Sequence, residues 1–250
     1  SMLMARLFYE LGMECVIAHC NFQLRGDESE KDEKLVREYA QELGFPVFVI
    51  KFQTQKIAAD RKISIQMAAR ILRYEWFESL RQELQCDLIA IAQHANDHIE
   101  TTLLNLTRST GIQGLLGIQP KRDRLIRPIL FLSAQEVAKE VGDLKVPYRD
   151  DQSNFSSKYA RNKIRIEIIP KFQEIQPNFE SIMLENMKHF EESQQFIQKI
   201  VDQKRNEIFQ EDGSYVRILR TALKNDIHDA YLLFELFKPY GFQKNILKEM

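Results

Sequence analysis

The sequence predicts an α/β fold in which a parallel sheet carries helices on both faces. Short apolar segments alternate with amphipathic segments along the first half of the chain, which is typical of strand–helix–strand units. The apolar segments are nearly continuous in hydrophobic residues, as strands buried on both sides must be. The 250 residues include only Gly 9 and Pro 7, which disfavours a loop-rich sandwich or barrel and favours long helices.

Three segments have the pattern of buried strands, at residues 14–20, 46–52 and 87–92. Ligands of such sheets bind at the carboxyl ends of the strands, near the point where the strand order reverses. We therefore expect the chemistry to lie directly after Cys20, Phe52 and Ala92.

The helices follow from apolar residues spaced three and four apart. They are predicted at residues 28–43, 64–84, 97–108, 133–141 and 178–209. Gly44 ends the first of these helices, and Ser133 with Glu136 forms a capping box at the fourth. The last helix has near-heptad spacing that Gln194 and Lys204 interrupt, so we expect it to pack against a neighbouring domain. Gly213 marks a break, after which the chain is too short to bury a core of its own.

The composition excludes several classes of protein. A formal net charge of -1 excludes a globally basic nucleic-acid binder but allows a local basic patch. The count of Cys 3, without a Cys-x-x-Cys pair, predicts a reducing cytoplasm with neither a zinc site nor a disulfide framework. No apolar stretch approaches the roughly 20 residues of a membrane span, and no secretory signal is recognisable.

The third predicted strand delivers His94 into a turn, and Asp97 and Glu100 follow on one face of the next helix. Two carboxylates there are stabilised by the helix dipole, and they suit an ammonium group or a magnesium ion. Capping by Asp97 beside a solvated Glu100 is the plainer interpretation of the carboxylates alone. The presence of His94 with both acids at a switch point favours a binding site.

Cationic and polar side chains are predicted at the same edge of the sheet. Arg70 and Arg73 are three apart on one helix, where they suit phosphate or carboxylate, although a solvated face is the more frequent reason for such a pair. His19, Asn21 and Arg25 follow the first strand, where a helix entry with a surface arginine fits equally well.

Two basic stretches follow the sheet. They comprise Lys121, Arg122, Arg124 and Arg127, and then Lys158, Arg161, Lys163, Arg165 and Lys171. On a helix, Lys158, Arg161 and Arg165 share one face. Local positive charge in a neutral protein predicts a docking site for a phosphodiester backbone, with a merely solubilising face as the alternative.

These motifs, taken in order, resemble those of the bacterial tRNA(Ile)-lysidine synthetases over residues 1–172. The matching residues are His19-x-Asn21-x-x-Leu24-Arg25-Gly26, Ala68-Ala69-Arg70-x-x-Arg73-Tyr74, His94-x-x-Asp97-x-x-Glu100-Thr101, Thr107-Arg108-x-x-Gly111, Arg127-Pro128 and Asp151-x-Ser153-Asn154 with Tyr159-x-Arg161-Asn162-x-Ile164-Arg165. The series is far more specific than any one member. This family belongs to the PP-loop ATP-pyrophosphatases, whose sheet is of the adenine-nucleotide α-hydrolase type.

The resemblance implies an ATP-dependent carbon–nitrogen ligase. ATP adenylates O2 of the wobble cytidine of tRNA(Ile) with a CAU anticodon, and the ε-amine of free L-lysine displaces AMP from C2. Decoding changes from AUG to AUA. The resemblance implies ATP and Mg²⁺ as cofactors, a cytoplasmic location and no membrane partner, and it leaves a homodimer open.

The implied roles fall on residues that match the family's motifs. Asp97 and His94 are expected to be catalytic, and Asp97, Glu100 and Arg70 to bind lysine. The residues expected to bind ATP are Ser1, His19, Asn21, Arg25, Arg73 and His94. Those expected to bind tRNA are Lys121, Arg122, Arg124, Lys158, Arg161, Lys163 and Arg165. No protein metal ligand is assigned.

The chain departs from the family in two places. The pyrophosphate loop Ser-Gly-Gly-x-Asp-Ser is absent before Ser1, so we expect a longer natural chain and weak ATPase activity from these residues alone. Asn96-Asp97-His98 stands where the family often has Asp-Asp-Gln, which leaves the role of Asn96 open.

Three regions are expected: a catalytic domain over 1–172, a linker helix over 173–212 and the start of an accessory domain over 213–250. Two alternatives to the ligase are another PP-loop tRNA-modifying enzyme and a catalytically silent tRNA-binding module. A thiolase that needs Cys-x-x-Cys pairs is disfavoured.

Overall fold

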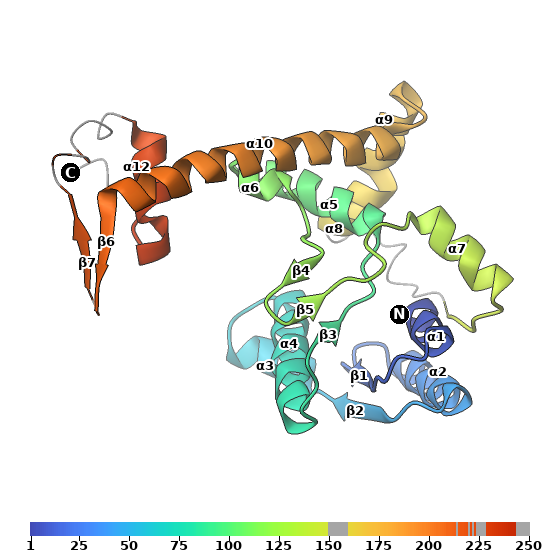
Figure 1. Cartoon of the computed structure of the whole chain (residues 1–250). Helices are drawn as coiled ribbons and strands as arrows, with labels where there is room; N and C mark the ends of the chain where they lie inside the picture. Colours follow the sequence, from blue (N-terminus) through green and yellow to red (C-terminus); the bar gives the residue numbers. More distant parts are fainter. Residues whose placement is uncertain (150–159, 214, 220, 222, 224–228, 244–250) are drawn as a thin grey trace. The chain divides into compact units, whose positions relative to one another are not determined.

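The computed structural model describes residues 1–149, 160–213, 215–219, 221, 223 and 229–243. The chain forms two compact units (Figure 1). The first unit comprises residues 1–109 and 117–184, and the second comprises residues 110–116 and 185–250. The predicted Asp151–Asn154 motif, Lys158 and Tyr159 lie outside the described residues.

The strands of the first unit form two small sheets. β1 (Ile17–Asn21) runs parallel to β2 (Val47–Lys51), and Asn21 pairs with Lys51 at the carboxyl ends. β3 (Ile89–Ala90) runs parallel to β5 (Leu125–Ile126), which pairs antiparallel with β4 (Lys121–Arg122). The parallel arrangement was predicted, whereas the β4–β5 hairpin was not.

Helices lie on both sides of the strands, as the sequence predicts. Those of the first unit include α1 (Met2–Glu10), α2 (Asp27–Leu43), α3 (Thr54–Asp60), α4 (Ile65–Glu83), α5 (Ala95–Leu106) and α7 (Ala134–Asp143). In Figure 1, α1 and α2 lie to one side of β1 and β2, and α3 and α4 lie to the other. A core of Leu3, Tyr39, Leu43 and Val146 joins α1 and α2 to the end of α7. The helix α3 was not predicted.

Local signals fix the helix ends near the predicted bounds. Gly44 closes α2 with φ +73, a left-handed conformation that glycine adopts without strain. The Ser64 side chain accepts a hydrogen bond from the Met67 N–H at 3.2 Å at the start of α4. Ser133 and Glu136 form the expected capping box of α7.

The end of the first unit contains a short π-helical turn. α8 (Ala160–Lys163) runs into the π-helix η2 (Ile164–Ile168) and then α9 (Ile169–Ile175), and the Ile169 N–H reaches the carbonyl of Ile164. Pro170 follows directly and has no N–H to offer the α-helical ladder, which accounts for the wider turn at this point. Arg161 and Arg165 lie on either side of the α8–η2 junction.

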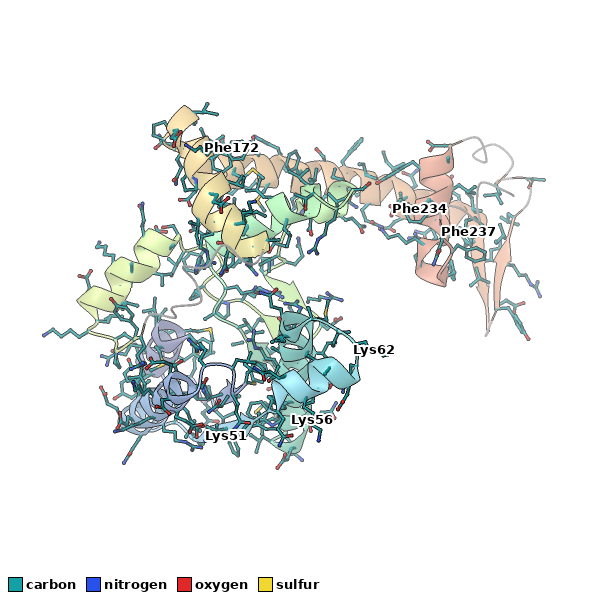
Figure 2. All side chains as sticks on the ribbon, turned by 180° about the vertical axis from the view of Figure 1, so that it is seen from behind. Lys51, Lys56, Lys62, Phe172, Phe234 and Phe237 are labelled. Atoms are coloured by element: carbon teal, nitrogen blue, oxygen red, sulfur yellow. The ribbon has the colours of Figure 1, made fainter. Side chains whose placement is uncertain are left out.

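The second unit is built on the long helix α10 (Phe179–Ile208), whose first residues belong to the first unit. It also contains α6 (Ile112–Leu115), the antiparallel pair β6 (Phe209–Asp212) and β7 (Tyr215–Ile218), α12 (Ala230–Phe237) and the 3₁₀ turn η3 (Lys238–Tyr240). Its core includes Ile208 of α10, Phe209 of β6 and Phe237 of α12. Of these, Figure 2 labels Phe237. The described residues of α12 therefore bury apolar surface together with α10 and β6.

No helix of the described residues has both the length and the apolar character that crossing a membrane requires.

Candidate functional site

The turn before α5 places His94 and Asp97 side by side. The Asp97 carboxylate accepts a hydrogen bond from the His94 backbone N–H at 3.0 Å, which secures the first turn of the helix. His94 Nε2 lies 3.6 Å from the same carboxylate oxygen. His94 Nδ1 is buried, and among the described residues it has no hydrogen-bond partner. This imidazole is therefore held beside a carboxylate with one ring nitrogen unused.

Glu100, one turn further along α5, is completely buried and bound by two arginines. Arg165 donates to both carboxylate oxygens, at 2.5 and 3.0 Å, and Arg161 Nε donates to one of them at 2.7 Å. Arg161 Nη2 also reaches Asp97, at 2.9 Å from its carboxylate and 3.1 Å from its carbonyl oxygen. We call Asp97, Glu100, Arg161 and Arg165 the ion cluster; its two positive and two negative charges balance.

The geometry of the ion cluster explains how a carboxylate can be buried here. A buried ionised group is tolerated only where it is paired and hydrogen-bonded. Burial acts to lower the pKa of Arg165, but the hydrogen bond and the charge of Glu100 outweigh it and raise that pKa. The arginines that the sequence assigns to RNA binding thus serve, in this structure, as the counter-ions of the acids that it assigns to lysine.

Asn96 has a supporting role that the sequence left open. Its Oδ1 accepts a hydrogen bond from the Ala134 N–H at 2.8 Å, and its Nδ2 donates to Glu180 at 2.5 Å. It thereby joins α5 to the first turns of α7 and α10. Burial, reinforced by the negative charge of Glu100, raises the pKa of Glu180. Sequence reasoning missed Glu180, because no local pattern links residues 84 positions apart.

Arg73 lies at the carboxyl ends of β1 and β2, as predicted. Its guanidinium is 5.2 Å from the centroid of the Phe22 ring, which stacks on Phe52 at 5.8 Å. Phe22 and Phe52 directly follow the two strands. Burial raises the pKa of Cys20 to about 11 against the opposing charge of Arg73, so this thiol stays protonated near neutral pH.

Arg70 and Arg127 both lie near Tyr74. Arg70 lies over the Tyr74 ring at 4.8 Å. Burial lowers the pKa of Arg127, and the positive charge of Arg70 acts in the same direction, whereas Tyr74 acts to raise it. Arg127 donates a hydrogen bond to the side chain of Gln93 at 2.6 Å. Gln93 immediately precedes His94 and was missed, because a lone glutamine carries no pattern. Among the described residues, no hydrogen bond or ion pair joins Arg70 or Arg73 to the ion cluster.

Asn21 is buried and its hydrogen-bonding groups are engaged within its own loop. Its Nδ2 donates to Glu30 at 3.0 Å and Glu33 at 3.1 Å, and its Oδ1 accepts from the Gln23 N–H. Lys51, labelled in Figure 2, reaches Glu30 at 2.5 Å. These contacts fix the backbone after β1, so Asn21 organises this loop.

The other predicted nucleotide ligands are His19, Arg25 and Ser1, and each lies in a different local environment. Burial lowers the pKa of His19, which favours the neutral imidazole. Arg25 pairs with Asp32 at 2.6 Å. Ser1 precedes α1 as its N-cap.

The remaining predicted RNA-binding residues are exposed. Lys121 and Arg122 form β4, and Arg124 follows in the hairpin turn. Lys163 on α8 lies 3.9 Å from Glu167. These side chains are available to phosphates, in contrast to Arg161 and Arg165.

The described residues offer no metal cluster at the predicted site. In the described part of the chain, no group of three or more His, Cys, Asp and Glu side chains could hold a metal ion. Asp97 and Glu100 do not fit a magnesium ion in this arrangement, because arginines already neutralise them. A hollow of about 400 Å³ lies in the second unit, lined by Gln113, Tyr231 and Lys238 among others, and contains none of the predicted site residues.

The chain matches known proteins over most of its length. Residues 1–172 match the model of the PP-loop domain family. A tRNA(Ile)-lysidine synthase of Bacteroides thetaiotaomicron is 36% identical over 250 residues, covering 100% of this chain and 58% of that protein. One from Porphyromonas gingivalis strain W83 is 39% identical over 242 residues, covering 96% and 52%. The chain thus spans about half the length of these relatives.

A solved structure agrees with the fold. The U34-tRNA thiolase NcsA from Methanococcus maripaludis, determined with its [4Fe-4S] cluster, superposes with a TM-score of 0.61 at 14% identity, over 76% of this chain and 67% of that one. At this identity the likeness concerns the fold alone, and it agrees with the predicted α/β sheet. With the family match over its first 172 residues, the chain belongs to the PP-loop domain family.

Proposed function

We propose that this protein is a tRNA(Ile)-lysidine synthase, an ATP-dependent ligase that joins the ε-amine of lysine to C2 of a wobble cytidine. Its membership of the PP-loop family supports ATP as the activating substrate. The relatives that match nearly all of the chain carry this activity in their names. The observation that carries the proposal is the pair of acids on adjoining turns of α5, Asp97 and Glu100, beside His94.

The chemistry assigns a separate task to each group. The cytidine O2 attacks the α-phosphate of ATP and releases pyrophosphate, so that O2 becomes a leaving group. The ε-amine then attacks C2, and the C2–O2 bond breaks to release AMP. Asp97 holds the incoming ammonium, and His94, with one ring nitrogen unbonded among the described residues, takes the proton that the amine must lose. Arg70 and Arg73 compensate phosphate charge at the edge of the sheet.

The substrates follow from this chemistry. They are tRNA(Ile) with a CAU anticodon, free L-lysine and ATP, and Mg²⁺ would accompany the triphosphate and neutralise the leaving pyrophosphate. Lys121, Arg122, Arg124 and Lys163 supply the exposed positive charge for RNA. Asn21 and Arg25 shape the loop after β1 for the nucleotide, and His19 on β1 and Ser1 before α1 are further candidate ligands of ATP.

A catalytically silent tRNA-binding module is the second candidate. The observation that favours it is the charge balance of the ion cluster, since Asp97 and Glu100 are already neutralised by Arg161 and Arg165. Such a module would bind tRNA but would not consume ATP.

Incubation of the full-length protein with a tRNA(Ile) transcript, ATP and labelled lysine tests the proposal. We expect label in the RNA that depends on ATP and on the wobble cytidine. The Asp97→Asn variant is expected to incorporate at least a hundredfold less lysine while it retains tRNA binding. RNA binding by the wild type without any labelled product would support the silent module instead.

A further inference from the structure

The ion cluster poses a problem for any cation that is to bind Asp97. Asp97 Oδ2 accepts the His94 N–H, and Oδ1 accepts Arg161 Nη2. Both oxygens of Glu100 are taken by guanidinium groups. Two carboxylates and two guanidinium groups already balance. A third cation would therefore leave the cluster with excess positive charge in a largely buried place, which is unfavourable.

The two arginines are not equivalent. Arg165 bonds both oxygens of Glu100 through Nε and Nη2, so it neutralises the buried acid by itself. Arg161 instead divides its donors between Glu100 and Asp97. The exposed fractions of the two side chains do not separate them, at 35% for Arg161 and 37% for Arg165. The contacts do, because Arg165 comes no closer to Asp97 than 3.6 Å, whereas Arg161 lies 2.9 Å from it. Arg161 is thus the member of the ion cluster that can leave without stranding the buried carboxylate.

The contacts of Arg161 Nη2 also match those of an ammonium group. This nitrogen donates to Asp97 Oδ1 at 2.9 Å and to the Asp97 carbonyl at 3.1 Å. Both acceptors suit an –NH₃⁺ group, which has three donors and no acceptor. A primary ammonium at this position would replace the bonds of Nη2 and would keep the charge of the cluster at zero once Arg161 has moved away.

A released Arg161 would be an anion site. A guanidinium freed from carboxylates prefers phosphate, which it binds with two parallel hydrogen bonds. Lys163, exposed two residues further along the chain, adds positive charge to the same segment. A phosphate of bound RNA is the anion that the proposed reaction brings to this surface.

We propose that Arg161 is an exchangeable counter-ion of Asp97: the ε-ammonium of lysine displaces its guanidinium, which then binds a phosphate of the tRNA. This inference rests on the proposed function and adds a coupling to it. Lysine and tRNA each favour the state in which Arg161 has left Asp97, so each strengthens the binding of the other by the same factor.

Equilibrium dialysis of labelled L-lysine against the full-length protein, with and without saturating tRNA(Ile) and without ATP, measures this coupling. For the wild type we expect tRNA to tighten lysine binding on the order of tenfold. For Arg161→Gln we expect lysine alone to bind more tightly than to the wild type, because its competitor for Asp97 is gone, and tRNA to add no more than twofold. If Arg161 were instead a ligand of lysine or a purely structural residue, its removal would weaken lysine binding.

Arg81→Gln is the matched control. Arg81 likewise bonds a carboxylate, that of Glu78, and a backbone carbonyl, that of Cys86, but it lies at the far end of α4 from Arg70 and Arg73. It is expected to keep the wild-type lysine affinity and coupling. Should Arg161→Gln fail to fold, Arg161→Lys retains the charge without the two-pronged geometry and is expected to show a reduced coupling.

The outcomes separate this inference from the proposed function. Unchanged or weakened lysine affinity in the Arg161 variants, or full coupling in them, overturns the exchange even when the wild type makes lysidine. A wild type that neither binds lysine nor incorporates it overturns both. Tighter lysine binding in Arg161→Gln together with lost coupling supports the exchange.

Discussion

Arg165 donates two hydrogen bonds to Glu100, across 65 residues of sequence. This contact joins η2 to α5 and neutralises an acid that is completely buried. The same pair holds the Glu100 side chain in the candidate site and offsets its buried charge, so the stability of this unit and the geometry of the site both depend on it.

We expect Arg165→Met to destabilise the protein strongly. Removal of one partner from a buried ion pair leaves an uncompensated charge, and such changes cost about 3 kcal/mol. Urea unfolding, followed by circular dichroism, measures the free energy of unfolding. Lys163→Met, which breaks the exposed 3.9 Å pair with Glu167, is the control and should cost less than about 1 kcal/mol. Equal small effects of the two variants would contradict the role given to Arg165.

Gly117→Ala is predicted to destabilise the region after α6. Gly117 has φ +58, and a Cβ there would lie 2.6 Å from Thr102 Oγ1, 2.7 Å from His98 Nδ1 and 2.9 Å from the His98 carbonyl. Both the strain and the overlap favour glycine, so we expect a loss of more than about 1 kcal/mol in the free energy of unfolding. Gly142→Ala in α7 meets nothing within 4 Å and should be neutral or stabilising by up to about 1 kcal/mol.

The stability of the protein is expected to fall as the pH drops from 6.5 towards 4, in part because of His98. Burial lowers the pKa of His98 to about 4 from 6.5, and its Nδ1 accepts the Ile118 N–H at 2.8 Å, so the folded state holds the neutral ring. The unfolded state binds the proton first, which removes on the order of 2 kcal/mol over this range.

Urea unfolding at several pH values tests the role of His98. The His98→Asn variant keeps a hydrogen-bond acceptor but loses the titration, so its stability should change less between pH 6.5 and 4 than that of the wild type. His189→Asn, on an exposed face of α10, serves as the control. The same pH dependence in His98→Asn as in the wild type would argue against this assignment.

The exposed hairpin of β4 and β5 is predicted to carry part of the RNA affinity. Replacing both Lys121 and Arg122 with Gln should weaken tRNA binding. It should also reduce the slope of the logarithm of the binding constant against the logarithm of the salt concentration by roughly 1 to 2. Neutralising Lys56 and Lys62, labelled in Figure 2, removes the same charge near α3 and should change the slope little. A filter-binding titration across salt concentrations distinguishes them, and equal slopes for both double variants would refute the docking site.

The sequence predicted what depends on local pattern. The bounds of α2, α4 and α10 agree with the predicted helices within one residue, because apolar spacing, Gly44 and Ser64 act within a few residues of the ends they determine. The parallel strands also follow from their continuous apolar character. The short α3 and the β4–β5 hairpin were not predicted, since neither is long enough to show a period.

The sequence predicted which residues belong to the candidate site, but not which of them form ion pairs with one another. His94, Asp97 and Glu100 were selected from their positions after a strand, and the structure brings all three together. The ion pairs of Arg161 and Arg165 with these acids join positions 61 to 65 apart, which a charge pattern along one helix cannot reveal. Helical spacing instead suggested a solvent-facing basic surface. The roles of all these residues in binding and catalysis stay predictions.

The π-helical turn η2 sets how the chain tolerates changes in length. A π turn contains about one residue more than an α turn, so deleting a single residue after Arg165, within Ile166–Ile168, can restore the ordinary pitch and leave the contact of Arg165 with Glu100 in place. A deletion between Asp97 and Glu100 in α5 would instead rotate one side chain by about 100° around the helix axis relative to the other. Length variation among homologous chains should therefore concentrate in this turn.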